Sequence, residues 1–294
     1  MEAIIKFWKK PSSSAYIFLM ASVILLILFS IIPLVMAFGL SFFDVSMTLD
    51  SATFVGFENF VRGLKDPRFL NSLKVTGIFT AIEIPIQVFG ALIVANFITK
   101  NNFKNKMFRI IYFLPVICSA TAIGIMWKMI LHSNIGIVTA YLEMLGFGKI
   151  NFFNTPSLTI YVVAFISIWR SFGISAVIYV TAIQQVSKSL YEASEIDGAN
   201  KFQQFLNITV PSIKPTFWYI LMTRFAGALQ IFDIIYVTTN GGPNYTTEST
   251  VSYIYERAFS SRAEMGYASA MSVMLFFIIM IITVIMYRQM NKED

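Results

Sequence analysis

The stretch MGYASAMSVMLFFIIMIITVIMY (Met265–Tyr287) contains no charged residue. An α-helix needs about 20 mostly apolar residues to cross the hydrocarbon core of a bilayer. The stretch is long enough and apolar enough to do so. We therefore predict a membrane-spanning helix near the C-terminal end of the chain.

The composition of the whole chain extends this prediction. Its 294 residues are 56% hydrophobic and 13% charged, whereas a soluble domain usually carries about 25% charged residues. The segment from Pro11 to Phe43 is also free of charge, and four more apolar stretches hold only one or two ionisable groups each. The sequence predicts an all-α integral membrane protein, with a single transmembrane domain over residues 1–294. The six predicted spans are 15–42, 73–98, 109–131, 158–183, 216–238 and 265–287.

The lysines and arginines predict the orientation of these spans, because short cytoplasmic loops carry an excess of both residues. Twelve of them fall in the two termini and in the second and fourth loops, and six fall in the other loops. Both termini and the loop 188–215 are therefore expected on the cytoplasmic side. Topology accounts for the net charge of +6, so no nucleic-acid partner is predicted.

Motifs that the sequence lacks narrow the class of protein. It has no GxxxxGK[ST] phosphate loop, so the chain is not expected to hydrolyse ATP or to be an enzyme. A single cysteine, Cys118, and a single histidine, His132, argue against a metal site. A self-sufficient secondary transporter usually has more spans, built as repeats. We expect a subunit of a larger complex, without a cofactor of its own.

A polar stretch, EASEIDGANKFQQFLNITVPSIKP (Glu192–Pro215), lies between two of the most apolar segments. Gly198 predicts the end of a short helix, because glycine readily takes the left-handed conformation found after helix ends. Phe202, Phe205 and Leu206 share one face of a second predicted helix. Such local order favours a docking element over a simple linker.

This stretch resembles the EAA loop of binding-protein-dependent ABC importer permeases. It departs from the common pattern at Ser194, often Ala, and at Val210, often Leu. The segments IYVTAIQQVSKSLYEAS and IFDIIYVTTNGGPNYTTESTVSYIYERAF are similar to the sugar-permease branch, and the NGGP turn favours the F-type maltose subunit. The resemblance covers nearly the whole chain. The positions that match the loop pattern are Glu192, Ala193, Ser194, Asp197, Gly198, Ala199, Ile208, Pro211 and Pro215.

The resemblance implies a type I ABC importer permease fold and a set of partners. These are a homologous second permease subunit, two ATPase subunits that bind ATP and Mg, and an extracytoplasmic solute-binding protein. The chain would lie in a bacterial or archaeal cytoplasmic membrane, in contact with lipid. Glu192 is expected to anchor the loop electrostatically to an ATPase subunit, whereas Asp197 fits a capping, pairing or purely structural role equally well. The expected coupling residues are Glu192, Ala193, Ser194, Asp197, Gly198, Ala199 and Pro211.

The resemblance also implies a pathway for a sugar substrate. Its position follows from counting back from the EAA loop and from the NGGP turn to the segments that line the cavity of the related maltose subunit. Polar and aromatic neighbours are added, because sugars bind planar polar groups and aromatic rings. The predicted pathway residues are Ser167, Trp169, Arg170, Ser171, Ile174, Arg224, Ala228, Gln230, Ile231 and Tyr236.

The two arginines leave the charge of the substrate open. Guanidinium groups bind carboxylate or phosphate bidentately, which would suit a uronate oligosaccharide or a glycerol phosphate. Alternatively, Arg170 pairs with Asp233 or Glu83, or Arg224 reaches the inner lipid headgroups. We prefer a neutral oligosaccharide on this second interpretation.

A stand-alone channel or ion-coupled carrier is the main rival. Glu83 and Asp233 would then be proton or sodium sites, since acids inside a membrane are costly and often functional. The EAA loop argues against this rival, because such a carrier has no use for it.

Overall fold

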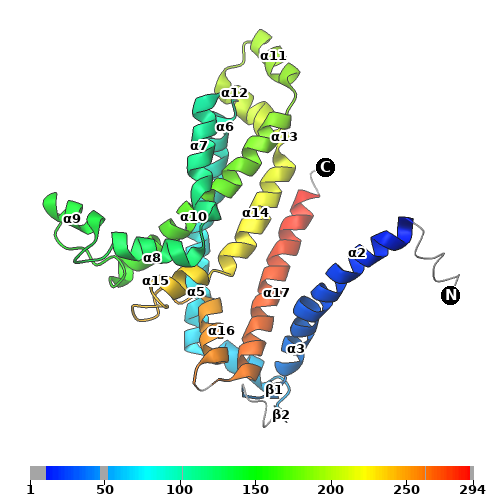
Figure 1. The fold of residues 1–294 in the computed structure, drawn as a ribbon, viewed down its shortest axis with the longest axis vertical. Helices are drawn as coiled ribbons and strands as arrows, with labels where there is room; N and C mark the ends of the chain where they lie inside the picture. The colour runs from blue at the N-terminus through cyan, green and yellow to red at the C-terminus, as the bar shows by residue number, and fades with distance from the viewer. Residues whose placement is uncertain (1–10, 47–51, 101, 262, 292–294) are drawn as a thin grey trace. The chain divides into compact units, whose positions relative to one another are not determined.

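The computed structural model describes residues 11–46, 52–100, 102–261 and 263–291, most of which are helical (Figure 1). Lys6, Lys9, Lys10 and Lys292, which entered the topology prediction, lie outside the described residues. Contacts divide the chain into two compact units, Met1–Lys65 with Ile254–Leu275, and Asp66–Tyr253 with Phe276–Asp294. Helices α16 (Thr250–Phe259) and α17 (Met265–Met290) contribute residues to both units.

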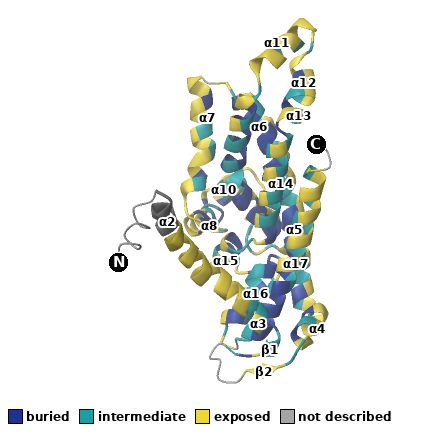
Figure 2. Cartoon of the chain, turned by 90° about the vertical axis from the view of Figure 1, so that its right-hand side faces the viewer, coloured by how far each residue is buried: buried dark blue, intermediate teal, exposed yellow. Residues whose placement is uncertain are grey.

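The first unit begins with a long apolar helical segment whose described side chains are almost all exposed (Figure 2). Asn59 fixes the chain that follows it, because its Nδ2 donates to the carbonyl oxygens of Ser41 at 3.1 Å and Phe43 at 2.9 Å. Phe43 also pairs with Phe54 in a short antiparallel ladder. Besides its parts of α16 and α17, the described elements of this unit are α2 (Pro11–Leu26), the π-helical turn η1 (Ile27–Ile31), α3 (Ile32–Leu40), β1 (Phe43–Asp44), β2 (Thr53–Phe54) and α4 (Glu58–Lys65).

The second unit is an assembly of helices. Its elements, besides parts of α16 and α17, are α5 (Pro67–Pro85), η2 (Ile86–Gly90), α6 (Ala91–Ile98), α7 (Phe103–Phe113), η3 (Leu114–Ile117), α8 (Ala120–Ile130), α9 (Ile137–Met144), α10 (Pro156–Gln185), α11 (Lys188–Ile196), α12 (Lys201–Gln204), η4 (Phe205–Thr209), α13 (Val210–Ser212), α14 (Lys214–Leu229) and α15 (Asp233–Thr238).

Helix α10 is the centre of the second unit and contacts α5, α6, α7, α8, α14 and α15. Two buried apolar clusters lie along it, one that includes Phe79 and Val163 and one that includes Ala91 and Tyr179. A Cβ atom on Gly173 would lie 2.1 Å from the carbonyl oxygen of Tyr112. Glycine is therefore what allows α7 to approach α10 this closely.

Five described helical segments are long and apolar enough to cross a membrane, judged by length and composition. A sixth is added if the bent pair Phe103–Ile117 and Ala120–Ile130 counts as one span. This range of five to six includes the predicted count. The five segments are Leu19–Leu40, Pro67–Ile98, Pro156–Gln185, Lys214–Thr238 and Met265–Met290.

The predicted third span, 109–131, is broken in the structure and includes parts of α7 and α8. Its two parts meet at 101°, because the backbone between them leaves the helical region at Cys118, with φ −81° and ψ 146°. The Ser119 side chain then caps α8 by accepting from the N–H of Ala122 at 3.1 Å. A serine cap starts a new helix in a new direction.

Pro85 alters the second span without ending it. Proline has no N–H to donate inside a helix, and here the helix widens into the π-helical turn η2 directly after it. The span nevertheless continues from Pro67 to Ile98. Glu83 and Gln87, on either side of the proline, are both buried, so the irregular turn carries a polar pair into the interior of the unit.

Arg68 links the start of α5 to the segment between α15 and α16. Its Nε and Nη2 donate to the two carboxylate oxygens of Glu248 at 2.8 and 2.6 Å, and Glu248 is 3% exposed. The guanidinium also lies over the rings of Tyr245 and Tyr253, at 4.0 and 4.9 Å from their centroids. The Tyr253 hydroxyl in turn donates to Asp66 at 2.5 Å. This cluster holds the segment after the predicted NGGP turn against α5.

Candidate functional site

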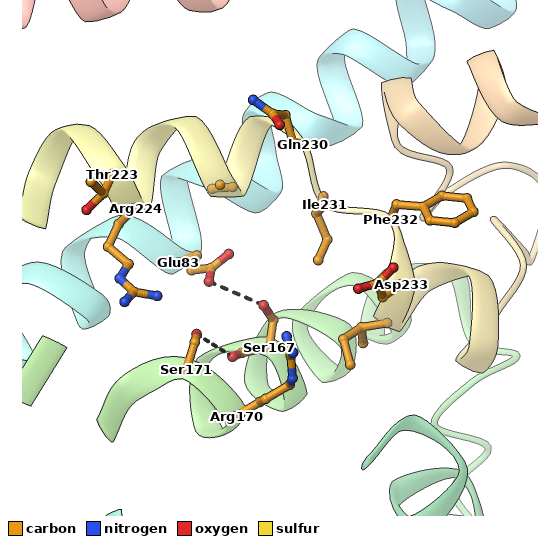
Figure 3. A pocket seen from close by; sticks show the side chains of 13 residues that line it. Glu83, Ser167, Arg170, Ser171, Thr223, Arg224, Gln230, Ile231, Phe232 and Asp233 are labelled. Carbon is orange, nitrogen blue, oxygen red and sulfur yellow. Dashed lines mark hydrogen bonds between the residues drawn. The ribbon is translucent and has the colours of Figure 1, made fainter. Parts of the chain in front are cut away.

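A polar cavity of about 220 Å³ lies in the second unit, between α5, α10, α14 and the turn from α14 to α15 (Figure 3). The helices of this unit are mostly apolar, and a buried polar group without a hydrogen-bond partner costs free energy. A cluster of polar side chains here therefore indicates a binding site. Its lining residues are Glu83, Ser167, Arg170, Ser171, Thr223, Arg224, Gly227, Ala228, Gln230, Ile231, Phe232, Asp233 and Ile234.

The break between α14 and α15 shapes one wall of this cavity. Gln230 ends α14 with φ −105° and ψ 17°, and Phe232 precedes α15 with φ −141° and ψ −59°. Neither residue continues the helix, so the chain changes direction at Ile231. Irregular backbone at membrane depth is tolerated where it lines a cavity, and Figure 3 shows Gln230, Ile231 and Asp233 around this turn.

Glu83 reaches the cavity from α5 and is held by α10. Its Oε1 accepts from Ser167 Oγ at 3.2 Å and, more weakly, from Gln87 Nε2 at 3.4 Å. Gln87 Nε2 also donates to Ser171 Oγ, and Ser171 Oγ donates to the carbonyl of Ser167 at 2.8 Å. Ser167, Arg170 and Ser171 lie at helical positions i, i+3 and i+4, so one face of α10 carries this network.

Four charged side chains line the cavity without pairing. Arg170 comes from α10, Arg224 from α14, Glu83 from α5 and Asp233 from the start of α15. No ion pair joins any two of them within the described part of the chain. The expected alternative that Arg170 pairs with Asp233 or Glu83 is therefore wrong in this structure.

Seven of the ten predicted pathway residues line the cavity, namely Ser167, Arg170, Ser171, Arg224, Ala228, Gln230 and Ile231. Trp169 lies one residue away from Arg170 on the helix, and its ring packs edge-on against Trp127 at 5.6 Å. The Tyr236 ring stacks on Phe232 at 5.1 Å, and Ile174 is one turn beyond Ser171. These three do not line the cavity. Whether the other seven contact substrate stays a prediction.

The counting from the two motifs missed six lining residues. Glu83 and Asp233 are recognisable in the sequence as acids within apolar segments. The sequence does not show, however, that they lie beside the predicted pathway residues. Phe232 could not be found, because its place depends on the break after α14. The six are Glu83, Thr223, Gly227, Phe232, Asp233 and Ile234.

The predicted coupling loop is a well-ordered helical hairpin. Helix α11 ends at Ile196 and is capped by Asp197, and Gly198 follows with φ +80°. The N–H of Gly198 donates to Glu195 O at 3.1 Å and that of Ala199 to Ser194 O at 2.9 Å, which is the Schellman arrangement. The predicted end of the helix at Gly198 is confirmed.

Side chains then tie α11 to the elements after the turn. Gln204 Nε2 donates to Ser194 Oγ at 2.9 Å and to Tyr191 O at 3.2 Å. The Tyr191 hydroxyl lies 2.9 Å from Thr209 Oγ1. These contacts join α11 to α12 and η4, which lead through α13 into α14. Pro211 lies in α13, immediately before α14.

The acids of α11 differ in their surroundings. Lys201 hydrogen-bonds and pairs with Glu195, which lowers the pKa of that carboxyl below its ordinary value of 4.5. The side chains of Glu192 and of the following Asp197 are exposed and have no hydrogen-bond or ion-pair partner within the described residues. Ala193 is exposed beside Glu192. Glu192 and Asp197 are thus the acids of the loop that are free to meet another protein.

Within the described ranges, no group of three or more His, Cys, Asp or Glu side chains is arranged to hold a metal ion.

The comparisons with known proteins agree with this architecture. Residues 67–292 match the family described as the binding-protein-dependent transport system inner membrane component. The chain belongs to this family. It is thus a permease, the inner membrane component of a binding-protein-dependent transport system.

Two curated relatives match the permease over nearly its whole length. The sulfoquinovosyl glycerol transport system permease protein SmoG of Agrobacterium fabrum is 31% identical over 95% of this chain and 91% of its own. The arabinooligosaccharides transport system permease protein AraP of Bacillus subtilis is 28% identical over 95% of this chain and 88% of its own. The permease is therefore similar to two proteins named for the transport of sugar-containing solutes.

A solved structure shows the same fold. A chain of a bacterial ABC transporter involved in the import of the acidic polysaccharide alginate superposes with a TM-score of 0.84 at 22% identity, covering 99% of this chain and 98% of that one. The expected ABC importer permease fold is confirmed. The orientation in the membrane stays a prediction.

Proposed function

We propose that the permease is one membrane subunit of an ATP-driven importer for a sugar or oligosaccharide. The polar cavity carries the proposal, because a hydroxyl-rich solute needs hydrogen-bonding groups inside an otherwise apolar assembly. Its lining offers hydroxyl, amide, guanidinium and carboxylate groups together. The saccharide names of the relatives support the same class of substrate, and a stand-alone ion-coupled carrier is not favoured.

The complete importer would contain a homologous second permease subunit, two ATPase subunits and an extracytoplasmic binding protein. ATP and Mg would bind only to the ATPase subunits. The bent pair α7–α8 would count as one of six spans in a bacterial or archaeal cytoplasmic membrane. Both termini and the loop 188–215 would face the cytoplasm, as the distribution of basic residues predicts.

The chain connectivity suggests how ATP hydrolysis would open and close the cavity. Helix α10 lines the cavity with Ser167 and Arg170 and leads into the loop at Gln185, whereas α14 leaves the loop at Lys214 and lines the cavity with Arg224. A rigid loop between these helices converts movement of an ATPase subunit into rigid-body movement of both cavity walls. The Schellman turn and the Gln204 hydrogen bonds provide that rigidity.

Glu192 would make the main electrostatic contact with the ATPase subunit. It is exposed and unpaired, whereas Glu195 is already engaged by Lys201. Removing one partner of a hydrogen-bonded charge pair at an interface costs about 2–5 kcal/mol. Replacement of Glu192 is therefore expected to impair coupling more than replacement of Glu195.

The test uses the importer reconstituted with its ATPase, second permease and binding protein. For Glu192→Ala, we expect ATP hydrolysis stimulated by loaded binding protein to fall by at least about tenfold, together with weaker ATPase assembly. Glu143→Ala is the matched control, because Glu143 is an exposed acid on α9, outside both the loop and the cavity. Unchanged assembly and unchanged stimulated hydrolysis in Glu192→Ala would show that the coupling role is wrong.

A further inference from the structure

Glu83 is the most deeply buried acid in the cavity. It is 7% exposed, and its second carboxylate oxygen, Oε2, has no hydrogen-bond partner within the described residues. A buried carboxylate oxygen without a donor is costly, and such groups call for an explanation. Because Glu83 lines the cavity (Figure 3), a ligand there could supply the missing donor.

The carboxylate is also held in place before any ligand arrives. Ser167 and Gln87 both donate to its other oxygen, Oε1. Two donors from two helices restrict rotation of the carboxylate and leave Oε2 as its free acceptor. Because the carboxylate is already ordered, binding of a donor to Oε2 does not carry the entropy cost of ordering this side chain.

The cavity also contains hydrogen-bond donors without an acceptor. Arg170 Nε and Arg224 Nε are buried, and in the described part of the chain neither has a hydrogen-bond partner. Two arginines and two acids line the cavity, so its formal charges cancel when all four groups are ionised. A ligand that satisfies these groups must both donate and accept hydrogen bonds, and it needs no net charge. Hydroxyl groups do both.

We propose that Glu83 is a specificity-determining residue that accepts a hydrogen bond from a hydroxyl group of a neutral saccharide and disfavours acidic saccharides in the same cavity. When ionised, the Glu83 carboxylate offsets one arginine and would repel a uronate carboxylate. The inference rests on the proposed function. It specifies in addition that the saccharide is neutral and that Glu83 discriminates against acidic saccharides.

The experiment measures uptake by the complete importer in proteoliposomes with ATP and binding protein. The probes are the neutral trisaccharides maltotriose, cellotriose and arabinotriose, and the acidic trisaccharide trigalacturonate. In the wild type, we expect uptake of at least one neutral probe and none, or far less, of trigalacturonate. If no saccharide is taken up, the proposed function fails. If trigalacturonate alone is taken up, the proposed function stands and this inference is overturned.

The decisive variant is Glu83→Gln, which keeps the size of the side chain and removes its charge. We expect KM for the neutral probe to rise roughly tenfold, the effect of losing one charge-assisted hydrogen bond, with a smaller loss in kcat. The preference for neutral over acidic probe should narrow as well. Glu143→Gln, on the exposed face of α9, should leave both KM values unchanged.

If the role of Glu83 is purely structural, a different pattern is expected. Glu83→Gln would then lower the amount of assembled importer, or kcat, and would leave KM and the neutral-to-acidic preference as in the wild type. That result overturns the proposal. If Glu83→Gln does not assemble, Ser167→Ala tests the same point, because it removes one of the two donors that orient the Glu83 carboxylate and leaves the carboxylate itself in place. An unchanged KM in Ser167→Ala would also overturn the proposal.

Discussion

At the scale of single residues, Arg68 shows how this permease places a charge among apolar helices. Its guanidinium meets both oxygens of Glu248 and the faces of Tyr245 and Tyr253. The planar fork of arginine suits a carboxylate and an aromatic ring at once. Lysine could not reproduce this set of contacts.

We predict that Glu248→Gln destabilises the protein by about 1.5–3 kcal/mol, because an amide replaces a buried carboxylate that accepts two charge-assisted hydrogen bonds. The melting temperature of the purified protein in detergent should fall by several degrees. The control is Arg62→Gln, which breaks the pair with Glu264, where the Arg62 side chain is 48% exposed. That pair should contribute less than about 1 kcal/mol. Equal losses in the two variants would contradict the account.

The sequence allowed the polar face of α10 to be predicted, but it did not allow the partners of single charged residues to be predicted. Ser167, Arg170 and Ser171 share one helical face. If one of them is correctly placed at the cavity, the helical spacing places the other two there as well. The sequence could not show that Glu195 is engaged by Lys201 while Glu192 stays free, because the Schellman turn that brings Lys201 back depends on the fold of the loop.

At the scale of elements, helix directions were less predictable than helix positions. The range 109–131 has the composition of one span, yet the chain turns by 101° within it. Pro115 and Ser119 are the local signals of this break. Composition alone cannot show which break is used, since Pro85 lies inside a span that continues through a π-helical turn.

The crossing of α7 and α10 provides a test at this scale. We predict that Gly173→Ala destabilises the protein by about 1–3 kcal/mol, because the new Cβ would lie 2.1 Å from the Tyr112 carbonyl oxygen, part of the backbone. Gly77→Ala is the matched control on α5, where a Cβ would meet nothing within 4 Å. It should be neutral or stabilise the protein by about 0.4–1 kcal/mol. Thermal unfolding in detergent measures both, and a Gly173→Ala protein as stable as Gly77→Ala would refute this view of the crossing.

At the scale of the whole molecule, the same two helices line the polar cavity and lead into and out of the predicted coupling loop. The loop lies between α10 and α14, and both of these helices line the cavity. The family match, the fold and the loop all favour a subunit that depends on partners. A carrier that works alone would need an energy source of its own, and the family to which the chain belongs works with a binding protein.

The most direct test of this account is saccharide uptake into proteoliposomes that contain the permease with its second permease and ATPase subunits. The account predicts that labelled saccharide accumulates inside only when loaded binding protein is present on the outer side and ATP is present on the ATPase side. Uptake should stop when ATP is replaced by a non-hydrolysable analogue. Equal uptake by the permease alone, without ATP or binding protein and driven by an ion gradient, would contradict the account.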